Sequence, residues 1–205
     1  MKLSSLGLLS LLLLITSAAP VAAASKTFPL MINTPFAACV GVPNAKSTPT
    51  AVVKVVQGKL NDTLIVTLKH VRPNLGFDLF TVQNSPFDAA GNPVVIPNFG
   101  LAWYQSDVEV SKGGSASVKI QTILVNQIFG FDAASGLAPT NTFHVGLWFD
   151  DPQAAAACGF TGFTPFNGVH HAGPMAFISL PVNTPGNPLG PLCFSPSGTP
   201  GECNP

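Results

Sequence analysis

Short segments in which apolar and polar residues alternate constrain the fold of this chain more than any other feature. Between residues 63 and 71, Leu64 and Val66 share one face of an extended chain, whereas Thr67 and Lys69 share the other. Segments that read as strands, most of them separated by turns rich in Gly, Pro and Asn, cover residues 27–33, 51–57, 63–71, 76–83, 101–104, 108–110, 116–125, 143–149 and 174–180. Short strands with long polar loops predict an all-β protein, an antiparallel Greek-key β-sandwich of about eight or nine strands.

Three of these segments carry more specific predictions. The turn Lys112-Gly113-Gly114 between residues 108–110 and 116–125 predicts a hairpin in which the flanking strands pair. Residues 143–149 are apolar on one face, at Phe143, Val145, Leu147 and Phe149, and partly apolar on the other. A strand of this kind belongs inside a sheet, so we expect these four side chains to be buried.

One short helix is predicted at residues 150–159. Asp150 and Asp151 precede Pro152, and aspartate is a good N-cap while proline is tolerated at the first helical position. The alanines at 154–157 favour a helix, and Gly159 is placed to end it.

Residues 1–24 have the pattern of a secretory signal peptide. Lys2 supplies the positive charge, and Ala22-Ala23-Ala24 offers a cleavage site. The apolar core at residues 6–15 is shorter than the roughly 20 residues of a membrane span, and no later segment is long and apolar enough to cross a bilayer. We therefore expect export, to the periplasm or the extracellular space.

The rest of the chain is predicted to hold one β-sandwich domain at residues 25–181 and a Pro/Gly-rich tail at residues 182–205. Charged residues make up only 9% of the chain, against roughly 25% in average soluble proteins. No basic stripe suits nucleic acid, and no basic amphipathic helix suits a membrane surface. The expected partner is therefore an unknown small molecule, glycan or protein.

Four cysteines in an exported chain predict two disulfides. Three pairings are possible. We favour Cys193–Cys203, which closes a short loop rich in proline and glycine, and this choice leaves Cys39–Cys158. No Cys-x-x-Cys occurs, so zinc-ribbon and thioredoxin-type sites are disfavoured.

The histidines suggest a metal-site hypothesis. His144, His170 and His171, with Asp150 or Asp151, are ligand types suited to zinc or copper. Adjacent histidines in an extended chain point to opposite faces, so only one of His170 and His171 joins His144 easily. The alternative, which we favour, is that His144 is a core or interface histidine hydrogen-bonded to backbone and that the histidine pair lies in a loop.

Hydrolytic catalysis has little support in the sequence. The Gly-x-Ser-x-Gly motif is absent, and no motif ties Ser106 or Ser111 to a histidine and an acid. Glycoside cleavage needs two acids across a cleft, whereas Asp150 and Asp151 are more simply a helix cap. We therefore assign no catalytic residue.

Aromatic residues suggest a ligand groove. Trp103, Tyr104 and Trp148 are its candidate residues, and it would bind sugar, peptide or another apolar ligand. Three phenylalanines join this set: Phe160, Phe163 and Phe166. The alternative is that these rings are core. We therefore predict a secreted, non-enzymatic binding or structural protein without a cofactor; the alternative is a zinc- or copper-binding protein, redox-active or not, centred on His144 and His171.

Residues 68–80 resemble the strand–turn–strand of Greek-key sandwiches, with Val71-Arg72-Pro73-Asn74-Leu75-Gly76-Phe77-Asp78-Leu79-Phe80 at their centre. In outline this segment is similar to the Leu-x-x-Gly-x-x-Gly-Phe-His-x-His hairpin of the copper/zinc superoxide dismutases. At the copper-ligand positions of that motif this chain has Asp78 and Phe80. His171-Ala172-Gly173-Pro174 also resembles that family's zinc loop, but it follows the hairpin by roughly 95 residues. The resemblance implies shared architecture and no copper site.

Overall fold

A computed structural model describes residues 25–96, 98–122, 130–132, 137–140, 144–162, 173–182 and 190–192. The strands of its main sheet are β1 (Ser25–Ile32), β2 (Thr50–Val56), β3 (Asp62–Lys69), β4 (Gly76–Val82), β5 (Ala102–Glu109), β6 (Ala116–Thr122), β9 (His144–Phe149) and β10 (Met175–Ile178). A separate pair consists of β7 (Gly130–Asp132) and β8 (Leu137–Thr140). Every strand pairing is antiparallel, so the all-β prediction is confirmed.

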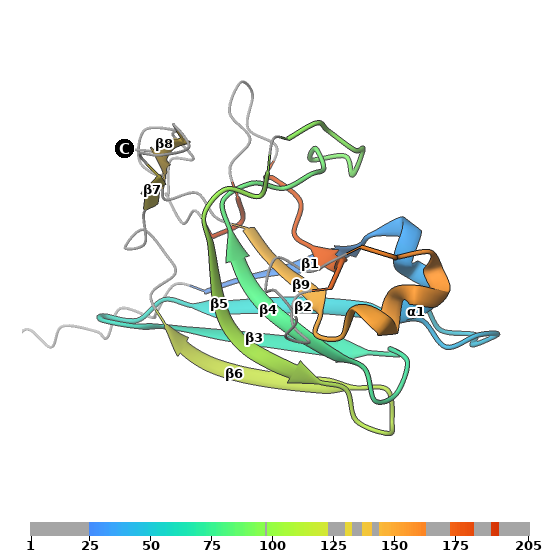
Figure 1. Ribbon diagram of the computed structural model, residues 1–205. Coiled ribbons are helices and arrows are strands. Elements are labelled where there is room, and N and C mark those ends of the chain that lie inside the picture. The colour runs from blue at the N-terminus through green and yellow to red at the C-terminus, as the bar shows by residue number, and fades with distance from the viewer. Residues whose placement is uncertain are drawn as a thin grey trace, which may run out of the picture.

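The eight strands of the main sheet follow the order β5-β4-β9-β10-β1-β2-β3-β6. Strand β1 joins two layers, because residues 25–30 pair with β2 while Met31 and Ile32 pair with β10. The first layer is β1-β2-β3-β6, and the second is β5-β4-β9-β10; β4 and β5 cross over β2, β3 and β6 in Figure 1. The Greek-key connectivity stays a prediction.

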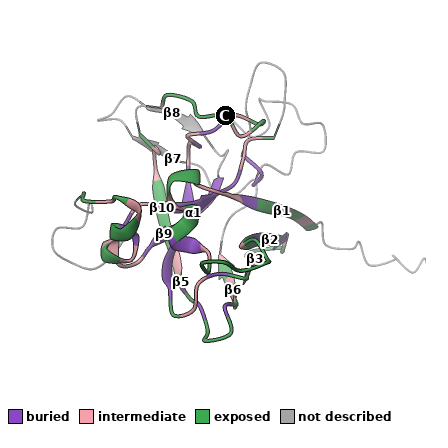
Figure 2. Ribbon diagram, turned by 90° about the vertical axis from the view of Figure 1, so that its right-hand side faces the viewer, coloured by how far each residue is buried: buried purple, intermediate pink, exposed green. Residues whose placement is uncertain are grey.

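The main core fills the space between the two layers. In β2 and β3 buried and exposed or half-buried positions alternate, because only one face of the first layer is covered, and the first half of β1 is likewise exposed at alternate positions (Figure 2). In β4, β9 and β10 every residue is buried, because both faces of these three strands are covered. The predicted burial of Val145, Leu147 and Phe149 is confirmed, and Phe143 lies outside the described residues.

The predicted hairpin at Lys112-Gly113-Gly114 is wrong. The turn itself forms, since the amide of Ser111 donates to the carbonyl of Ser115 over 2.9 Å. However, β5 pairs with β4 and β6 pairs with β3, so the turn carries the chain from one layer to the other. Its backbone docks on the β3–β4 connection, where the amide of Val71 donates to the carbonyl of Gly114 over 3.0 Å. The β3–β4 and β5–β6 connections, which both cross between the layers, therefore lie together.

The segment predicted as two short strands at 101–104 and 108–110 is the single strand β5. Its register against β4 shifts between Leu79 and Phe80, so Gln105 has no partner residue on β4. The side chain of this extra residue donates to the hydroxyl of Thr81 over 3.0 Å. A β-bulge of this kind interrupts the alternation pattern, which explains why the sequence reads as two segments.

The predicted helix at residues 150–159 is the 3-10 helix η2 (Pro152–Cys158). Its cap and stop are as predicted: Asp151 accepts from the amide of Gln153 over 2.9 Å, and Gly159 ends the helix with a φ of 84°. The predicted loop after β1 contains two further helical turns, η1 (Thr34–Phe36) and α1 (Ala37–Val40). The α-helix of the described residues therefore lies at a site where the sequence predicted none.

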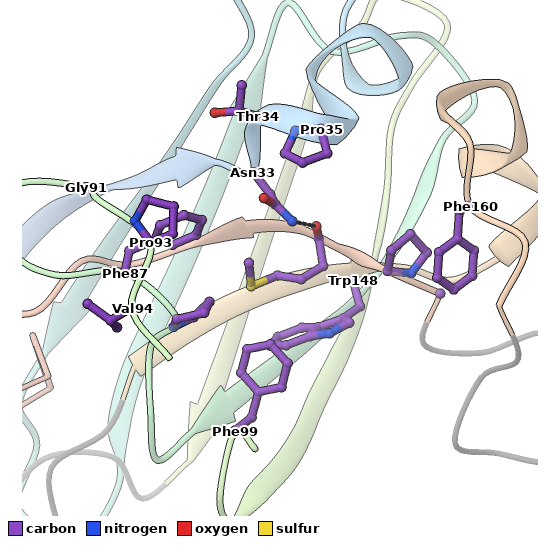
Figure 3. A pocket seen from close by; sticks show the side chains of 14 residues that line it. Asn33, Thr34, Pro35, Phe87, Gly91, Pro93, Val94, Phe99, Trp148 and Phe160 are labelled. Atoms are coloured by element: carbon purple, nitrogen blue, oxygen red, sulfur yellow. Dashed lines mark hydrogen bonds between the residues drawn. The ribbon is translucent and has the colours of Figure 1, made fainter. Parts of the chain in front are cut away.

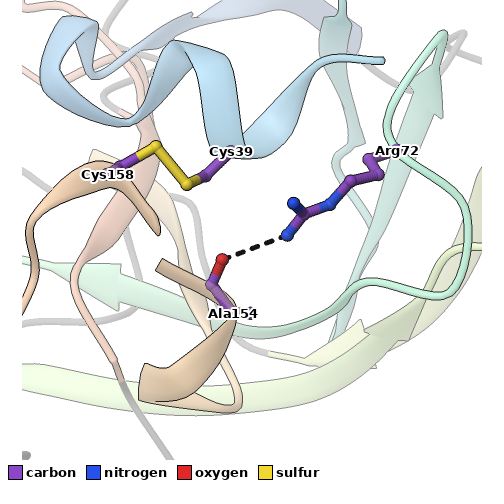
Figure 4. The surroundings of a disulfide bond; sticks show 4 residues. All are labelled: Cys39, Arg72, Ala154 and Cys158. Carbon is purple, nitrogen blue, oxygen red and sulfur yellow. Dashed lines mark hydrogen bonds between the residues drawn. A yellow bond between two sulfur atoms is a disulfide. The ribbon is translucent and has the colours of Figure 1, made fainter. Parts of the chain in front are cut away.

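A disulfide between Cys39 and Cys158 joins α1 to η2 (Figure 4). Beside it, the guanidinium of Arg72, from the β3–β4 connection, donates to the carbonyl of Ala154 in η2 over 3.0 Å. Three segments far apart in the sequence are thus fastened at one end of the sandwich. This pairing is the one left by the favoured Cys193–Cys203 bridge, whose two cysteines lie outside the described residues.

Candidate functional site

Part of the outer face of the second layer is apolar, although the outer face of an antiparallel layer commonly meets water. Six buried residues form a cluster on it: Phe80, Val82, Phe87, Trp148, Met175 and Ile178. Beside this cluster lies a groove of about 670 Å³, bounded by residues 84–100 and by the turn that follows β1. Small-molecule pockets typically measure roughly 300–1,000 Å³, so the groove has the size of a ligand site.

Among the described residues, the lining of the groove carries no charged side chain. It consists of Asn33, Thr34, Pro35, Pro86, Phe87, Gly91, Pro93, Val94, Phe99, Trp148, Phe160, Gly173, Pro174 and Met175. Figure 3 shows Trp148 and Phe99 together on one wall and Phe87, Pro93 and Val94 at one end. At the opposite end Phe160 closes the groove.

The loop that supplies one end of the groove is held by its own hydrogen bonds. Asp88 accepts from the amides of Ala90 and Asn92 over 2.9 and 2.8 Å. The side-chain and backbone hydrogen bonds from Asn92 lower the pKa of the Asp88 carboxyl. At the base, the amide of Asn84 donates to the carbonyl of Phe99 over 2.9 Å. The loop therefore presents its apolar residues from a fixed frame.

The indole of Trp148 lies over Gly146, two residues earlier in β9. A Cβ atom at residue 146 would come within 2.5 Å of Cζ3 of the indole, so only glycine leaves room for the ring. The indole also meets Phe80 and Phe99 edge-to-face, at centroid distances of 5.5 and 5.2 Å. Its orientation is therefore fixed by three neighbours.

These contacts extend into a row of rings across three strands. Tyr104 on β5 meets Phe80 on β4 at 5.7 Å, Phe80 meets Trp148 on β9, and Trp148 meets Phe99 in the groove. We call Tyr104, Phe80, Trp148 and Phe99 the aromatic row. The row leads from the exposed edge of the second layer, where Tyr104 is 53% exposed, into the groove.

The structure places only some of the predicted groove residues in the groove. Trp148 and Phe160 line the groove, and Tyr104 reaches it only through the aromatic row. Trp103 does not line the groove. It precedes Tyr104 in β5, and neighbouring residues of a strand point to opposite faces. Phe163 and Phe166 lie outside the described residues.

The sequence analysis missed the contributions of Phe87, Phe99 and Met175. A loop with three prolines and the apolar run at residues 94–96 was the one available signal.

Four carboxylates share the outer face of the second layer beside the aromatic row. We call Asp78, Asp107, Glu109 and Asp150 the carboxylate cluster. Asp78 stands opposite Trp148 on one side and opposite Asp107 on the other. Glu109 pairs with Gly76, and a Cβ atom at Gly76 would collide with the Asp150 carboxylate. The cluster therefore spans β5, β4 and the end of β9.

Two members of this cluster, Glu109 and Asp150, have raised pKa values. Burial raises the pKa of Glu109, and the charges of Asp150, Asp107 and Asp78 raise it further. Burial likewise raises the pKa of Asp150, although the Asp151 amide, which donates to Asp150 Oδ1 over 2.6 Å, lowers it. Negative charge is thus concentrated on this face.

Tyr104 connects the carboxylate cluster to the aromatic row. Its hydroxyl donates to Asp107 Oδ1 over 2.7 Å. Burial, with this hydrogen bond and the nearby carboxylates, raises the pKa of Tyr104 to about 12, so the phenol stays protonated. The aromatic row therefore begins at Tyr104, beside the Asp107 carboxylate, and ends at Phe99 in the groove.

His144 is a buried core histidine hydrogen-bonded to backbone, as the favoured alternative predicted. Its Nδ1 lies 3.1 Å from the carbonyl oxygen of Ser179 and 3.2 Å from the Ser179 hydroxyl, which itself accepts from the amide of Val145 over 3.0 Å. Burial lowers the pKa of His144 to about 4, against the opposing effect of the hydrogen bond to Ser179. The imidazole is therefore neutral at pH 7.

The predicted metal ligands are not brought together where they can be located. His144 begins β9 and Asp150 follows its last residue, so their backbones lie roughly 20 Å apart at the rise of an extended chain. His170 and His171 lie outside the described residues, so their part of the hypothesis stays a prediction. Within the described ranges, no group of three or more His, Cys, Asp or Glu residues is placed to hold a metal ion.

No family model, curated protein or solved structure matches this chain. Among the described residues, no helix has the length and apolar character required to cross a membrane. The groove, the aromatic row and the carboxylate cluster are therefore the features of the molecule that bear on its function.

Proposed function

We propose that this protein is an exported, non-enzymatic binding protein and that the groove on the outer face of the second layer is its ligand site. The proposal rests on one observation. An uncharged groove of about 670 Å³, walled by aromatic rings and prolines, stands on strands that are buried on both faces. Such a site is rigid and apolar before any ligand arrives, and preformed apolar pockets are typical of small-molecule binding.

The lining residues support binding over catalysis. Asn33 and Thr34 are the polar aliphatic side chains among them, and the Asn33 amide already donates to the carbonyl of Met175 over 3.0 Å. None of the described lining side chains is a general acid or base at neutral pH. Export is supported by the signal-peptide pattern of residues 1–24, and the Cys39–Cys158 disulfide is compatible with it.

Fluorescence tests the proposal, because one of the two tryptophans lies in the groove. The variant Trp103→Phe leaves Trp148 as the single tryptophan. We expect the neutral probe N-phenyl-1-naphthylamine to quench Trp148 emission in a saturable manner, with matching enhancement of the probe's own emission.

Two adjacent valines supply the matched variants. Val94 lines the groove and is 42% exposed, whereas Val95 is fully exposed and does not line the groove. In the Trp103→Phe background, Val94→Asp places a charge in the apolar wall and weakens probe binding, while Val95→Asp leaves it intact. Quenching that never saturates, or that both aspartates affect equally, would show that the groove is not the binding site.

A further inference from the structure

The aromatic row connects the groove to the exposed edge of the second layer. From Phe99 and Trp148 in the groove, two steps of 5.5 and 5.7 Å between ring centroids lead through Phe80 to the exposed ring of Tyr104. The Tyr104 hydroxyl is bound to Asp107, a member of the carboxylate cluster. A ligand that follows the row therefore passes from an uncharged groove to a negatively charged edge.

The lysines of the main sheet all lie in its first layer. Strands β4, β5, β9 and β10 contain no lysine or arginine. Strands β1, β2, β3 and β6 contain one lysine each: Lys26, Lys54, Lys69 and Lys119. The neighbouring charges that raise the pKa values of Glu109 and Asp150 are all carboxylates. The face that carries the groove thus attracts cations and repels anions.

We infer that the ligand of this groove is a small cationic amphiphile, with its apolar part in the groove and its ammonium-type group over Tyr104, beside Asp107 and Glu109. This inference rests on the proposed function and specifies its ligand class. A cation over an aromatic face gains from the ring quadrupole, and the exposed ring of Tyr104 offers such a face next to a carboxylate. The groove volume suits a small molecule.

Other ligand classes fit the same surfaces less well. An anionic amphiphile would bring its headgroup against the carboxylate cluster. A glycan needs several hydrogen-bonding side chains around its hydroxyls, whereas the groove offers Asn33 and Thr34. A neutral apolar molecule would fill the groove but leave the charged end of the aromatic row unused.

Three probes with the same alkyl chain separate these classes: dodecyltrimethylammonium, dodecanol and dodecyl sulfate, each below its aggregation concentration. Binding is followed by Trp148 quenching in the Trp103→Phe protein. We expect the cation to bind about fivefold more tightly than the alcohol, as two exposed carboxylates would provide, and the sulfate to bind most weakly. High salt should shrink the preference, because exposed charges are screened.

Paired variants assign the preference to the carboxylate cluster. Asp107→Asn with Glu109→Gln should bring the ratio of cation to alcohol affinity close to one. The control, Asn61→Lys with Ser117→Lys, changes the net charge by the same amount at exposed positions of the first layer and should leave the ratio unchanged.

The outcomes separate the two proposals. If none of the three probes binds, the proposed function fails and the ligand class falls with it. If the alcohol binds as tightly as the cation, or if the control pair removes the preference as fully as the cluster pair does, the groove stands and the cationic ligand is refuted.

Discussion

Trp148 forms a wall of the groove because residue 146 is a glycine. The indole occupies the space that a Cβ atom would need, and the carbonyl oxygen of Phe177 lies 3.2 Å from the same position. The constraint is therefore steric and acts from two sides. A single methyl group is enough to test whether the orientation of one ring controls the groove.

We predict that Gly146→Ala displaces the indole of Trp148 and weakens binding of the naphthyl probe. Overpacking of this kind costs about 1–3 kcal/mol, so the free energy of unfolding should fall by that amount. Gly113→Ala is the matched control, since its nearest atom would be the Ser111 hydroxyl at 3.7 Å. Probe titration and urea denaturation of both variants check the prediction; unchanged probe affinity in Gly146→Ala would mean that the indole does not shape the groove.

At the scale of elements, β9 is central in the second layer, with β4 on one side and β10 on the other. Its inward residues meet the core between the layers, and its outward residues support the groove. The strand therefore connects fold stability to the site.

We predict that Leu147→Ala lowers the free energy of unfolding by roughly 2–5 kcal/mol, because it opens a cavity in a fully buried part of the core. Val52→Ala on β2 is the comparison, since Val52 is 38% exposed and its truncation should cost much less. Chemical denaturation measures both. If both variants lost a similarly small amount of unfolding free energy, β9 would lie at the periphery of the fold.

Element prediction from the sequence succeeded where local patterns decide the outcome. The strand β9 and the cap of η2 at Asp151 follow from alternation and capping chemistry, which depend on near neighbours in sequence. Pairing of β5 and β6 could not be predicted, because a tight turn fixes local geometry and does not decide whether the flanking strands share a layer. Helix α1 was missed, since its four residues are held by a disulfide to a residue 119 positions away.

The site was predictable only in part for a similar reason. The sequence suggested Trp148 as a groove residue, but the other walls come from segments whose proximity depends on the layer crossing and on the loop at residues 84–100. His144 was correctly favoured as a core histidine, yet its partner Ser179 is 35 residues away. Likewise, the carboxylate cluster assembles from three strands, and no local motif links its members.

At the scale of the whole molecule, two kinds of titrating group give the free energy of unfolding opposite dependences on pH. Folding lowers the pKa of His144 to about 4 from 6.5, so the unfolded chain binds the proton more readily. Its contribution is fully present above about pH 6.5 and is lost as the pH falls towards 4. Folding raises the pKa values of Glu109 and Asp150, so the folded state binds those protons more readily, and stability gains as the pH falls through the raised values.

We predict that these contributions separate in two variants compared with the wild type by urea denaturation across pH 7 to about 4. The stability difference between the wild type and His144→Asn should be constant above about pH 6.5 and should fall by about 3 kcal/mol as the pH approaches 4. The difference between the wild type and the pair Glu109→Gln with Asp150→Asn should change in the opposite direction, rising on acidification as mutual repulsion in the carboxylate cluster is relieved. Because each comparison subtracts the same background, titrating groups that do not interact with the substituted residues cancel. A His144→Asn difference that stays flat down to pH 4 would contradict the neutral buried histidine, and a falling difference for the carboxylate pair would contradict the concentration of negative charge on which the cationic ligand depends.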